Sequence, residues 1–216
     1  MDIDDILADL DAATVPQETL DIQLLTRLWV AERVAPELLV WPDDLISRIT
    51  ERMSAQVELI EEQTATMDPK SSFGLIVLQT EMERVKFLVR SYLRARLAKV
   101  DAHPLYYNEG EPAGRLSVEE KQYLTAHQTL LEAHYGASFL GQFPAQLQRM
   151  DDPAGGISMV ETPDAERAVF VRALRDAGLV RMPGRDESWD VKRGDVRVVR
   201  WSAVRDLVEI GDLELI

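Results

Sequence analysis

The sequence of 216 residues contains no cysteine, which excludes a disulfide framework, a thiolate metal site and a cysteine nucleophile. It also lacks a run of ~18 apolar residues, the length that a membrane-spanning helix needs. Its first twenty-one residues hold no lysine or arginine, which excludes a secretory signal or an arginine-rich transit peptide there. We therefore expect a protein of a reducing compartment that is not embedded in a membrane.

Sequence motifs of catalysis and cofactor binding are missing as well. The chain has no HExxH zinc motif, no glycine-rich dinucleotide or phosphate loop and no GxSxG nucleophile elbow. Two of its three histidines, His127 and His134, are seven residues apart, not at the four-residue spacing of a helical zinc site. We expect no enzyme activity, no metal and no cofactor. The alternative within the enzyme class is a hydrolase that uses the acidic pair Asp43 and Asp44.

Acidic residues dominate the chain, which has a net charge of −14 and a pI near 4.7. This balance disfavours tight non-specific binding of DNA by the whole chain, because affinity for phosphate depends on lysine and arginine. Half of the net charge lies in the first twenty-one residues, whose seven acids are Asp2, Asp4, Asp5, Asp9, Asp11, Glu18 and Asp21.

Within this acidic tail, four aliphatic residues recur at the spacing of one helix face. Such a short segment does not hold a helix alone in water, but it can become helical in the groove of another protein. We predict a docking peptide with aliphatic anchors and a solvated acidic back. The alternative is a tail that is disordered or folds back on its own domain. The predicted docking residues are Ile3, Asp4, Asp5, Ile6, Leu7 and Leu10.

Hydrophobic periodicity after the tail predicts four long helices, at about 19–34, 42–68, 71–101 and 117–138. The last opens with a capping box, in which the Ser117 hydroxyl and the Glu120 carboxylate satisfy free backbone amides. The segment between the third and fourth helices, residues 104–116, shows no motif, and we expect a mobile loop there.

The spacing changes after a segment rich in proline, glycine and aspartate at residues 149–158. Three short β-prone runs follow at 168–174, 188–191 and 196–201, and residues 192–195 are expected to form a hairpin turn. A short helix at 202–211 with a glycine cap and a final strand complete the chain. The expected fold class is α+β: an acidic tail (1–17), a helical A domain (18–145), a linker (146–158) and a small β-rich B domain (159–216).

The third predicted helix combines a wide apolar arc with basic residues. Arg96 and Lys99 fall inside this arc, where a base must snorkel or meet a carboxylate. The helix is either a core element with solvated edges or also packs on a partner subunit, with Arg96 or Lys99 paired across the contact. A face for single-stranded DNA is a further alternative, although aromatic residues are sparse. The candidate subunit-interface residues are Arg90, Tyr92, Arg94, Arg96 and Lys99.

Several stretches resemble the SLD5 family of subunits of the eukaryotic GINS complex, and they follow the family's order along both predicted domains. SYLRARLAKV is the most specific of them. They are APELL (35–39), MERVKF (82–87), SYLRARLAKV (91–100), FPAQLQRMD (143–151), PDAERAVFVR (163–172) and the terminal LI. Residues 181–195 are only loosely similar to the family, which leaves the strand boundaries there open.

The resemblance implies a helical A domain followed by a β-rich B domain. It implies a nuclear heterotetramer with three sister GINS subunits, which joins the Cdc45 protein and the minichromosome maintenance ring in the replicative helicase. ATP hydrolysis then belongs to the ring, the GINS subunits are scaffold, and any DNA contact is indirect or weak. The stretch IDDILADLD (3–11) is similar to the motif with which fungal members bind a trimeric replisome adaptor.

Overall fold

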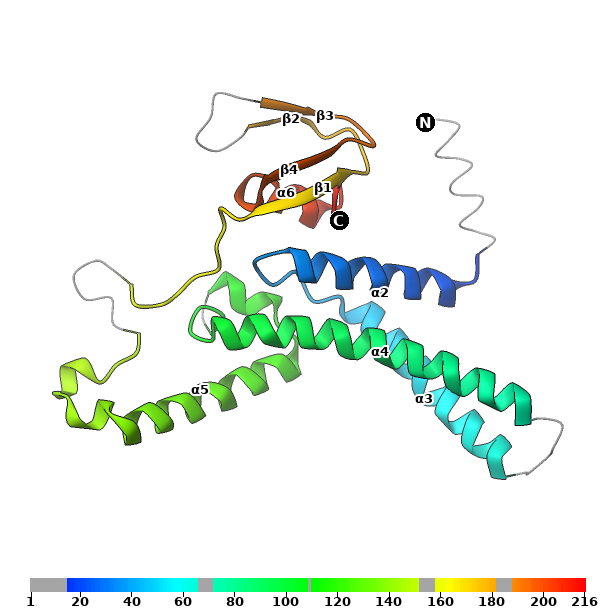
Figure 1. Ribbon diagram of the computed structural model, residues 1–216, viewed down its shortest axis with the longest axis horizontal. Helices are drawn as coiled ribbons and strands as arrows, with labels where there is room; N and C mark the ends of the chain where they lie inside the picture. Colours follow the sequence, from blue (N-terminus) through cyan, green and yellow to red (C-terminus); the bar gives the residue numbers. More distant parts are fainter. Residues whose placement is uncertain (1–14, 66–71, 109, 152–157, 182–187) are drawn as a thin grey trace. The chain divides into compact units, whose positions relative to one another are not determined.

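The structure is a computed structural model, shown in Figure 1. It describes residues 15–65, 72–108, 110–151, 158–181 and 188–216. The predicted docking residues of the acidic tail, residues 3–10, therefore lie outside the described part. Contacts divide the chain into two compact units: Met1–Trp29 with Pro42–Tyr92, and Val30–Trp41 with Leu93–Ile216.

The four predicted long helices are present, and their limits agree with the prediction to within a few residues. They are α2 (Gln17–Val34), α3 (Asp43–Ala65), α4 (Ser72–Ala102) and α5 (Val118–Ser138). Local signals explain these limits. Pro36 follows closely on the end of α2 and cannot continue the helix. The dipole of α3 favours the acids in its first turn, and Ser117 caps the start of α5. The capping box is confirmed: the Glu120 N–H donates to Ser117 Oγ over 3.1 Å, and the Ser117 N–H donates to the Glu120 carboxylate over 2.9 Å.

The first unit contains most of α2, all of α3 and the first two thirds of α4. Its buried apolar side chains recur at helical spacing on α3, as the sequence predicts. Leu45, Ile49 and Ile60 of α3 are buried, as are Leu25 of α2 and Tyr92 of α4.

The segment between α4 and α5 differs from the expected mobile loop. It packs as a turn followed by the 3-10 helix η1 (Glu111–Arg115). Tyr107 is 1% exposed and its hydroxyl accepts the Leu38 N–H over 3.1 Å. Tyr107 also lies in a buried cluster with Leu38, Val100, Leu116 and Leu124. The prediction was wrong because this one aromatic side chain anchors a segment that has no periodic pattern.

The described residues from 158 onward form two antiparallel sheets and one helix. Within the part of the chain that the structure describes, the three-stranded sheet has the order β4-β1-β5 and a second sheet is formed by β2 and β3. A left-handed Gly211 (φ +88°) caps α6, as the sequence predicts. The elements are β1 (Ala168–Ala173), β2 (Gly178–Arg181), β3 (Ser188–Val191), β4 (Val196–Arg200), α6 (Trp201–Ile210) and β5 (Leu213–Leu215); the short 3-10 helices η2 (Leu140–Gln142) and η3 (Ala145–Leu147) precede them.

The structure corrects two details of the predicted strands. Residues 192–195 form a turn but not a hairpin, because this turn leads from β3 of the small sheet to β4, which pairs with β1. Trp201, predicted as the end of a strand, begins α6. The strand β2 was not predicted at all. The helical region followed by small antiparallel sheets nevertheless confirms the α+β fold class.

The core of the second unit joins residues from distant parts of the sequence. Inward-facing side chains of β1, β3 and β4, among them Val171, Trp189 and Val199, pack with Trp201 of α6. Ala31, Ala35 and Leu39, from the end of α2 and the segment after it, belong to the same buried cluster: Ala31, Ala35, Leu39, Val169, Val171, Ala173, Trp189, Val191, Val199, Trp201, Val204, Leu213 and Leu215. The division by contacts therefore cuts across the expected boundary between an A and a B domain, which remains a sequence-based prediction.

Candidate protein-interaction surfaces

The Arg96 side chain of α4 is fully buried, and every nitrogen of its guanidinium donates a hydrogen bond. Nε and Nη2 form a two-pronged contact with Glu120 over 2.7 and 2.9 Å. Nη1 reaches Glu32 over 3.1 Å. The remaining bonds go to the carbonyl oxygens of Leu39 (2.9 Å) and Arg115 (2.8 Å). This one side chain thus connects α4 with α2 and α5, with the segment between α2 and α3, and with the segment between α4 and α5.

Lys99 lies one turn further along α4 and completes this buried network. Its Nζ donates to Glu32 Oε1 over 2.6 Å and to the Glu37 carbonyl over 2.8 Å. Desolvation lowers the pKa of Lys99, and the neighbouring Glu32 carboxylate partly offsets this effect. Two bases, Arg96 and Lys99, therefore balance two carboxylates, Glu32 and Glu120, within one chain.

These contacts bear on the two interpretations of this helix, a core element or one that also pairs Arg96 or Lys99 with a partner subunit. The carboxylates that contact Arg96 in the structure are Glu32 and Glu120 of the same chain. Tyr92 is 1% exposed and Lys99 has its partners within the chain, so neither side chain offers a free surface. Arg90 and Arg94 are exposed, and their role at an interface remains a prediction.

A second ionic cluster, nearer the surface, links α6 to η1 and to the segment between α2 and α3. Arg115 contacts Glu209 of α6 over 2.5 Å and Glu111 over 3.2 Å. Arg205 of α6 reaches Glu111 over 2.8 Å and Glu37 over 3.4 Å. None of these charges was recognised as paired from the sequence. The contacts that involve α6 join residues far apart along the chain, and the Glu111–Arg115 pair lies in the segment that was expected to be a mobile loop.

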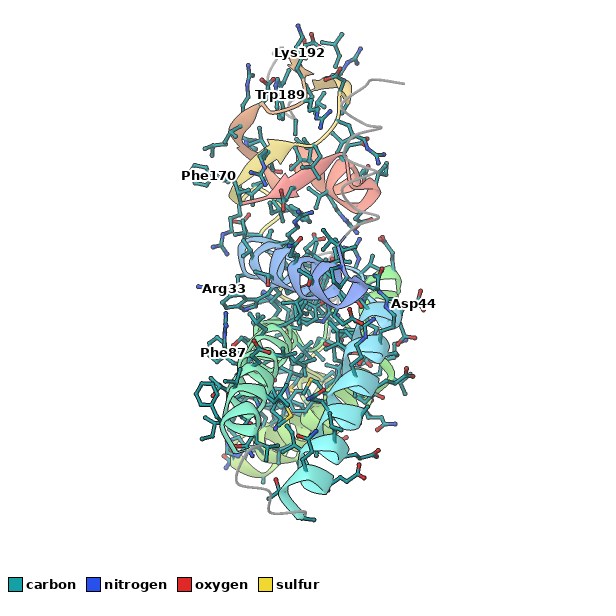
Figure 2. All side chains as sticks on the ribbon, turned by 90° about the vertical axis from the view of Figure 1, so that its right-hand side faces the viewer. Arg33, Asp44, Phe87, Phe170, Trp189 and Lys192 are labelled. Carbon is teal, nitrogen blue, oxygen red and sulfur yellow. The ribbon has the colours of Figure 1, made fainter. Side chains whose placement is uncertain are left out.

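Helix α4 also presents large apolar side chains to solvent in the first unit. Phe73 is 77% exposed and Phe87 is 61% exposed, and Ile76 and Val77 are exposed between them. Phe87 meets the ring of Trp29 edge-on, with 6.4 Å between the ring centroids, and lies at the outer side of its helix (Figure 2). Contiguous exposed apolar side chains are typical of contact surfaces for other proteins.

A second apolar surface, the aromatic ladder, follows the end of α5 and consists of Tyr135, Phe139 and Phe143. Consecutive rings meet edge-on with centroid distances of 5.8 and 6.3 Å. All three residues are exposed. A cavity of about 430 Å³ opens beside the ladder, lined in part by Leu105, Leu131 and Tyr135. The ladder offers aromatic anchors of the kind that dominate protein interfaces.

The first unit also contains an apolar groove of about 260 Å³ between α2, α3 and α4. Its walls include Met53 and Met82. At its rim, Asp21 accepts hydrogen bonds from Arg48 (2.9 Å) and Arg52 (2.7 Å). The Arg48 hydrogen bond, with help from Gln17 and Arg52, lowers the pKa of Asp21 to about 2. Asp21 is therefore ionised across the physiological range and ties α2 to α3.

The described part of the chain contains no group of three or more histidine, aspartate or glutamate side chains arranged to hold a metal ion. The Nδ1 atom of His127 lies 3.4 Å from a carboxylate oxygen of Asp101. Among the helices that the structure describes, none is long and apolar enough to cross a membrane.

Comparison with known protein families identifies both parts of the chain. Residues 49–139 match the model of the GINS complex protein helical bundle domain, and residues 163–216 match that of the DNA replication complex GINS protein SLD5 C-terminus. The chain belongs to the SLD5 family of GINS proteins. The family expected from the sequence is thereby confirmed, together with its order of a helical domain before a β-rich one.

Full-length relatives in fungi carry the same description, DNA replication complex GINS protein SLD5. The chain is 52% identical to that of Chaetomium globosum over the whole of both chains. It is 37% identical to that of Yarrowia lipolytica, over all of this chain and 85% of the relative. For Schizosaccharomyces pombe the identity is 36%, over all of this chain and 99% of the relative.

Proposed function

We propose that this SLD5 family member is a non-catalytic scaffold subunit of a GINS heterotetramer in the nucleus. The observation that carries the proposal is the exposure of large apolar side chains along α4 and the aromatic ladder, which an isolated chain leaves in water. Three sister GINS subunits are the partners that cover these surfaces. Through the tetramer, the chain joins the Cdc45 protein and the minichromosome maintenance ring in the replicative helicase.

The proposed assembly surface lies mainly on α2 and α4, and the aromatic ladder adds to it. Arg90 and Arg94 are exposed bases at its edge, suited to carboxylates of a sister subunit. The β-rich part docks on a sister subunit or on the helicase. Contact through several surfaces is consistent with a subunit that contributes binding energy and no chemistry.

The acidic tail is proposed to dock on a trimeric replisome adaptor. Burying its four aliphatic anchors contributes about 1.5–3 kcal/mol per side chain. Ordering about nine residues costs roughly 1–2 kcal/mol each, a similar total. A single tail therefore binds weakly, and a trimeric adaptor compensates through effective concentration.

Co-expression with three sister GINS subunits, followed by native mass measurement, tests the scaffold role. The expected result is one stoichiometric complex containing one copy of each subunit. A chain that stays monomeric and does not co-purify with its sisters contradicts the proposal.

The rival function is direct binding of single-stranded DNA through the exposed bases of α4. Because phosphate contacts release counterions, such binding falls steeply with salt. Salt-sensitive strand binding by the assembled tetramer that is lost in Arg90→Glu with Arg94→Glu, while the tetramer stays intact, would favour this rival.

A further inference from the structure

Strand β4 is an edge strand of the three-stranded sheet, because the order is β4-β1-β5. Hydrogen bonds at both ends of β4 show which of its residues bond to β1. The Ala173 N–H donates to the Asp195 carbonyl over 2.8 Å, and the Trp201 N–H donates to the Arg167 carbonyl over 3.0 Å. In an antiparallel pair, hydrogen-bonded and non-hydrogen-bonded positions alternate. The odd-numbered residues Arg197 and Val199 therefore turn their peptide groups toward β1.

The peptide groups of the even-numbered residues Val196, Val198 and Arg200 consequently point away from β1. Within the described residues, no backbone hydrogen bond joins these groups to a further strand. A row of open N–H and C=O groups of this kind is a template for one more strand.

The outer face of the sheet beside this edge is apolar. Val198 lies directly opposite Phe170 of β1, at a non-hydrogen-bonded position where side chains approach closely. Phe170 is 55% exposed, and Val196 and Val198 are each 54% exposed. Figure 2 shows Phe170 pointing away from its strand. A strand added to the edge would cover part of this apolar face.

The edge carries positive charge in an otherwise acidic chain. Between residues 192 and 200 the sequence has four bases, Lys192, Arg193, Arg197 and Arg200, and a single acid, Asp195. The Arg197 guanidinium lies 5.2 Å from the centroid of the Trp189 ring, and Arg200 contacts Glu166 over 2.7 Å. Two copies joined at this edge would bring like charges together, which disfavours self-pairing. The same charges favour an acidic strand.

We propose that β4 binds an extended segment of a partner protein as a fourth strand, and that this segment has apolar residues flanked by acids. Backbone hydrogen bonds from the N–H and C=O groups of Val196 and Val198 and from the N–H of Arg200 supply affinity; the Arg200 carbonyl belongs to the first turn of α6. The apolar residues of the segment cover Val196, Val198 and the adjoining Phe170. Its acids project to the opposite face of the added strand, where Arg197 lies. This mode is β-augmentation, in which the sheet edge reads the backbone and the side chains read the sequence.

Amide chemical shifts of the full chain test the proposal, with a short peptide of alternating glutamate and valine as the probe. We expect the amides of Val196, Val198 and Arg200 to shift more than those of Arg197 and Val199. A peptide with lysine in place of glutamate should cause much smaller shifts. Equal shifts with both peptides, or no localised shift on β4, would overturn the proposal.

Val198→Pro removes an outward N–H without removing a donor of the β1–β4 ladder. We expect it to weaken binding of the glutamate peptide about tenfold. Val198→Thr keeps the N–H and the β-branched shape, so it should bind like the original chain. Unchanged binding in Val198→Pro overturns the proposal if its unfolding midpoint matches that of Val198→Thr.

Arg197→Glu provides a second test that does not alter the backbone. It should reduce binding of the glutamate peptide and increase binding of the lysine peptide. Two other results would assign the edge to another occupant and overturn the proposal. One is a concentration-dependent dimer that shifts the β4 amides without peptide. The other is an equal response of these amides to oligothymidylate.

Discussion

The carboxylate of Glu120 closes the capping box of α5 and binds the buried guanidinium of Arg96 at the same time. Glu120 Oε2 accepts the Ser117 N–H and Arg96 Nη2, both over 2.9 Å, while Oε1 accepts Arg96 Nε over 2.7 Å. The start of α5 is thereby fixed against α4 by the same group that caps it. A local helix signal and a tertiary ion pair depend on one side chain.

Arg96→Met should therefore unfold or severely destabilise the chain. It leaves the Glu32 and Glu120 carboxylates buried without their main partner, and breaking a buried pair in this way costs about 3–5 kcal/mol. Urea denaturation of the chain measures this loss. Arg96→Glu should be at least as severe, and any failure to capture sister subunits would follow from misfolding.

Arg94→Glu is the matched control, because Arg94 lies two residues earlier on α4 and is exposed. We expect it to change the free energy of unfolding by no more than about 0.5 kcal/mol. If Arg96→Met lowered the free energy of unfolding as little as Arg94→Glu, the buried network would not be what holds this chain together.

The sequence was sufficient to place Arg96 on an apolar arc and to require a carboxylate for it, because helix periodicity is local. It could not identify that carboxylate. Glu32 lies 64 residues from Arg96, and Glu120 lies 24 residues away with a complete explanation as a cap. Nothing in either glutamate's local sequence distinguishes a buried from a solvated carboxylate, so a carboxylate of the same chain and one of a partner subunit both remained possible from the sequence.

The strands show the same limit in another form. Alternating residues in β1 and β4 revealed that strands exist, and Gly211 revealed where α6 ends. Which strands pair with each other was not predictable. A glycine-containing turn such as that at Gly194 can connect strands of two different sheets as readily as the two strands of one hairpin. Strand β2, with four residues and no regular burial pattern, lacks even the local signal.

Acid should weaken the contact between α2 and α3 through Asp21. The pKa of Asp21 in the folded chain is about 2, below its ordinary value of 3.8. The ionised Asp21 carboxylate therefore contributes its full stabilisation when the pH is above this ordinary value. That contribution is lost as the pH falls from about 4 toward 2. Urea midpoints measured along this range should fall less for Asp21→Asn than for the original chain. Glu58→Gln, at an exposed position of α3 beyond its first turn, is the control and should behave like the original chain.

Phe139→Glu should impair assembly with the sister subunits without unfolding the chain. Phe139 is 48% exposed and sits in the middle of the aromatic ladder, so a charge there disrupts a contact surface and not a core. Thr125→Glu places the same charge on an exposed part of α5 away from the ladder. Native mass measurement after co-expression should give the full complex with Thr125→Glu and a reduced yield with Phe139→Glu. Equal yields would remove the ladder from the proposed interface.

Ile6→Ala with Leu7→Ala should abolish binding to the trimeric adaptor and leave the tetramer whole. The two substitutions remove two of the four aliphatic anchors. The free energy gained by burying the anchors only slightly exceeds the entropy cost of ordering the tail, so losing two anchors is enough to abolish binding. Capture of the adaptor by the purified tetramer measures the effect. Asp9→Ala with Asp11→Ala changes the solvated back of the predicted helix and keeps every anchor, so it should retain substantial binding. Loss of the tetramer in the Ile6 and Leu7 variant would show instead that the tail is a structural part of the assembly, and adaptor binding at full strength would refute the docking peptide.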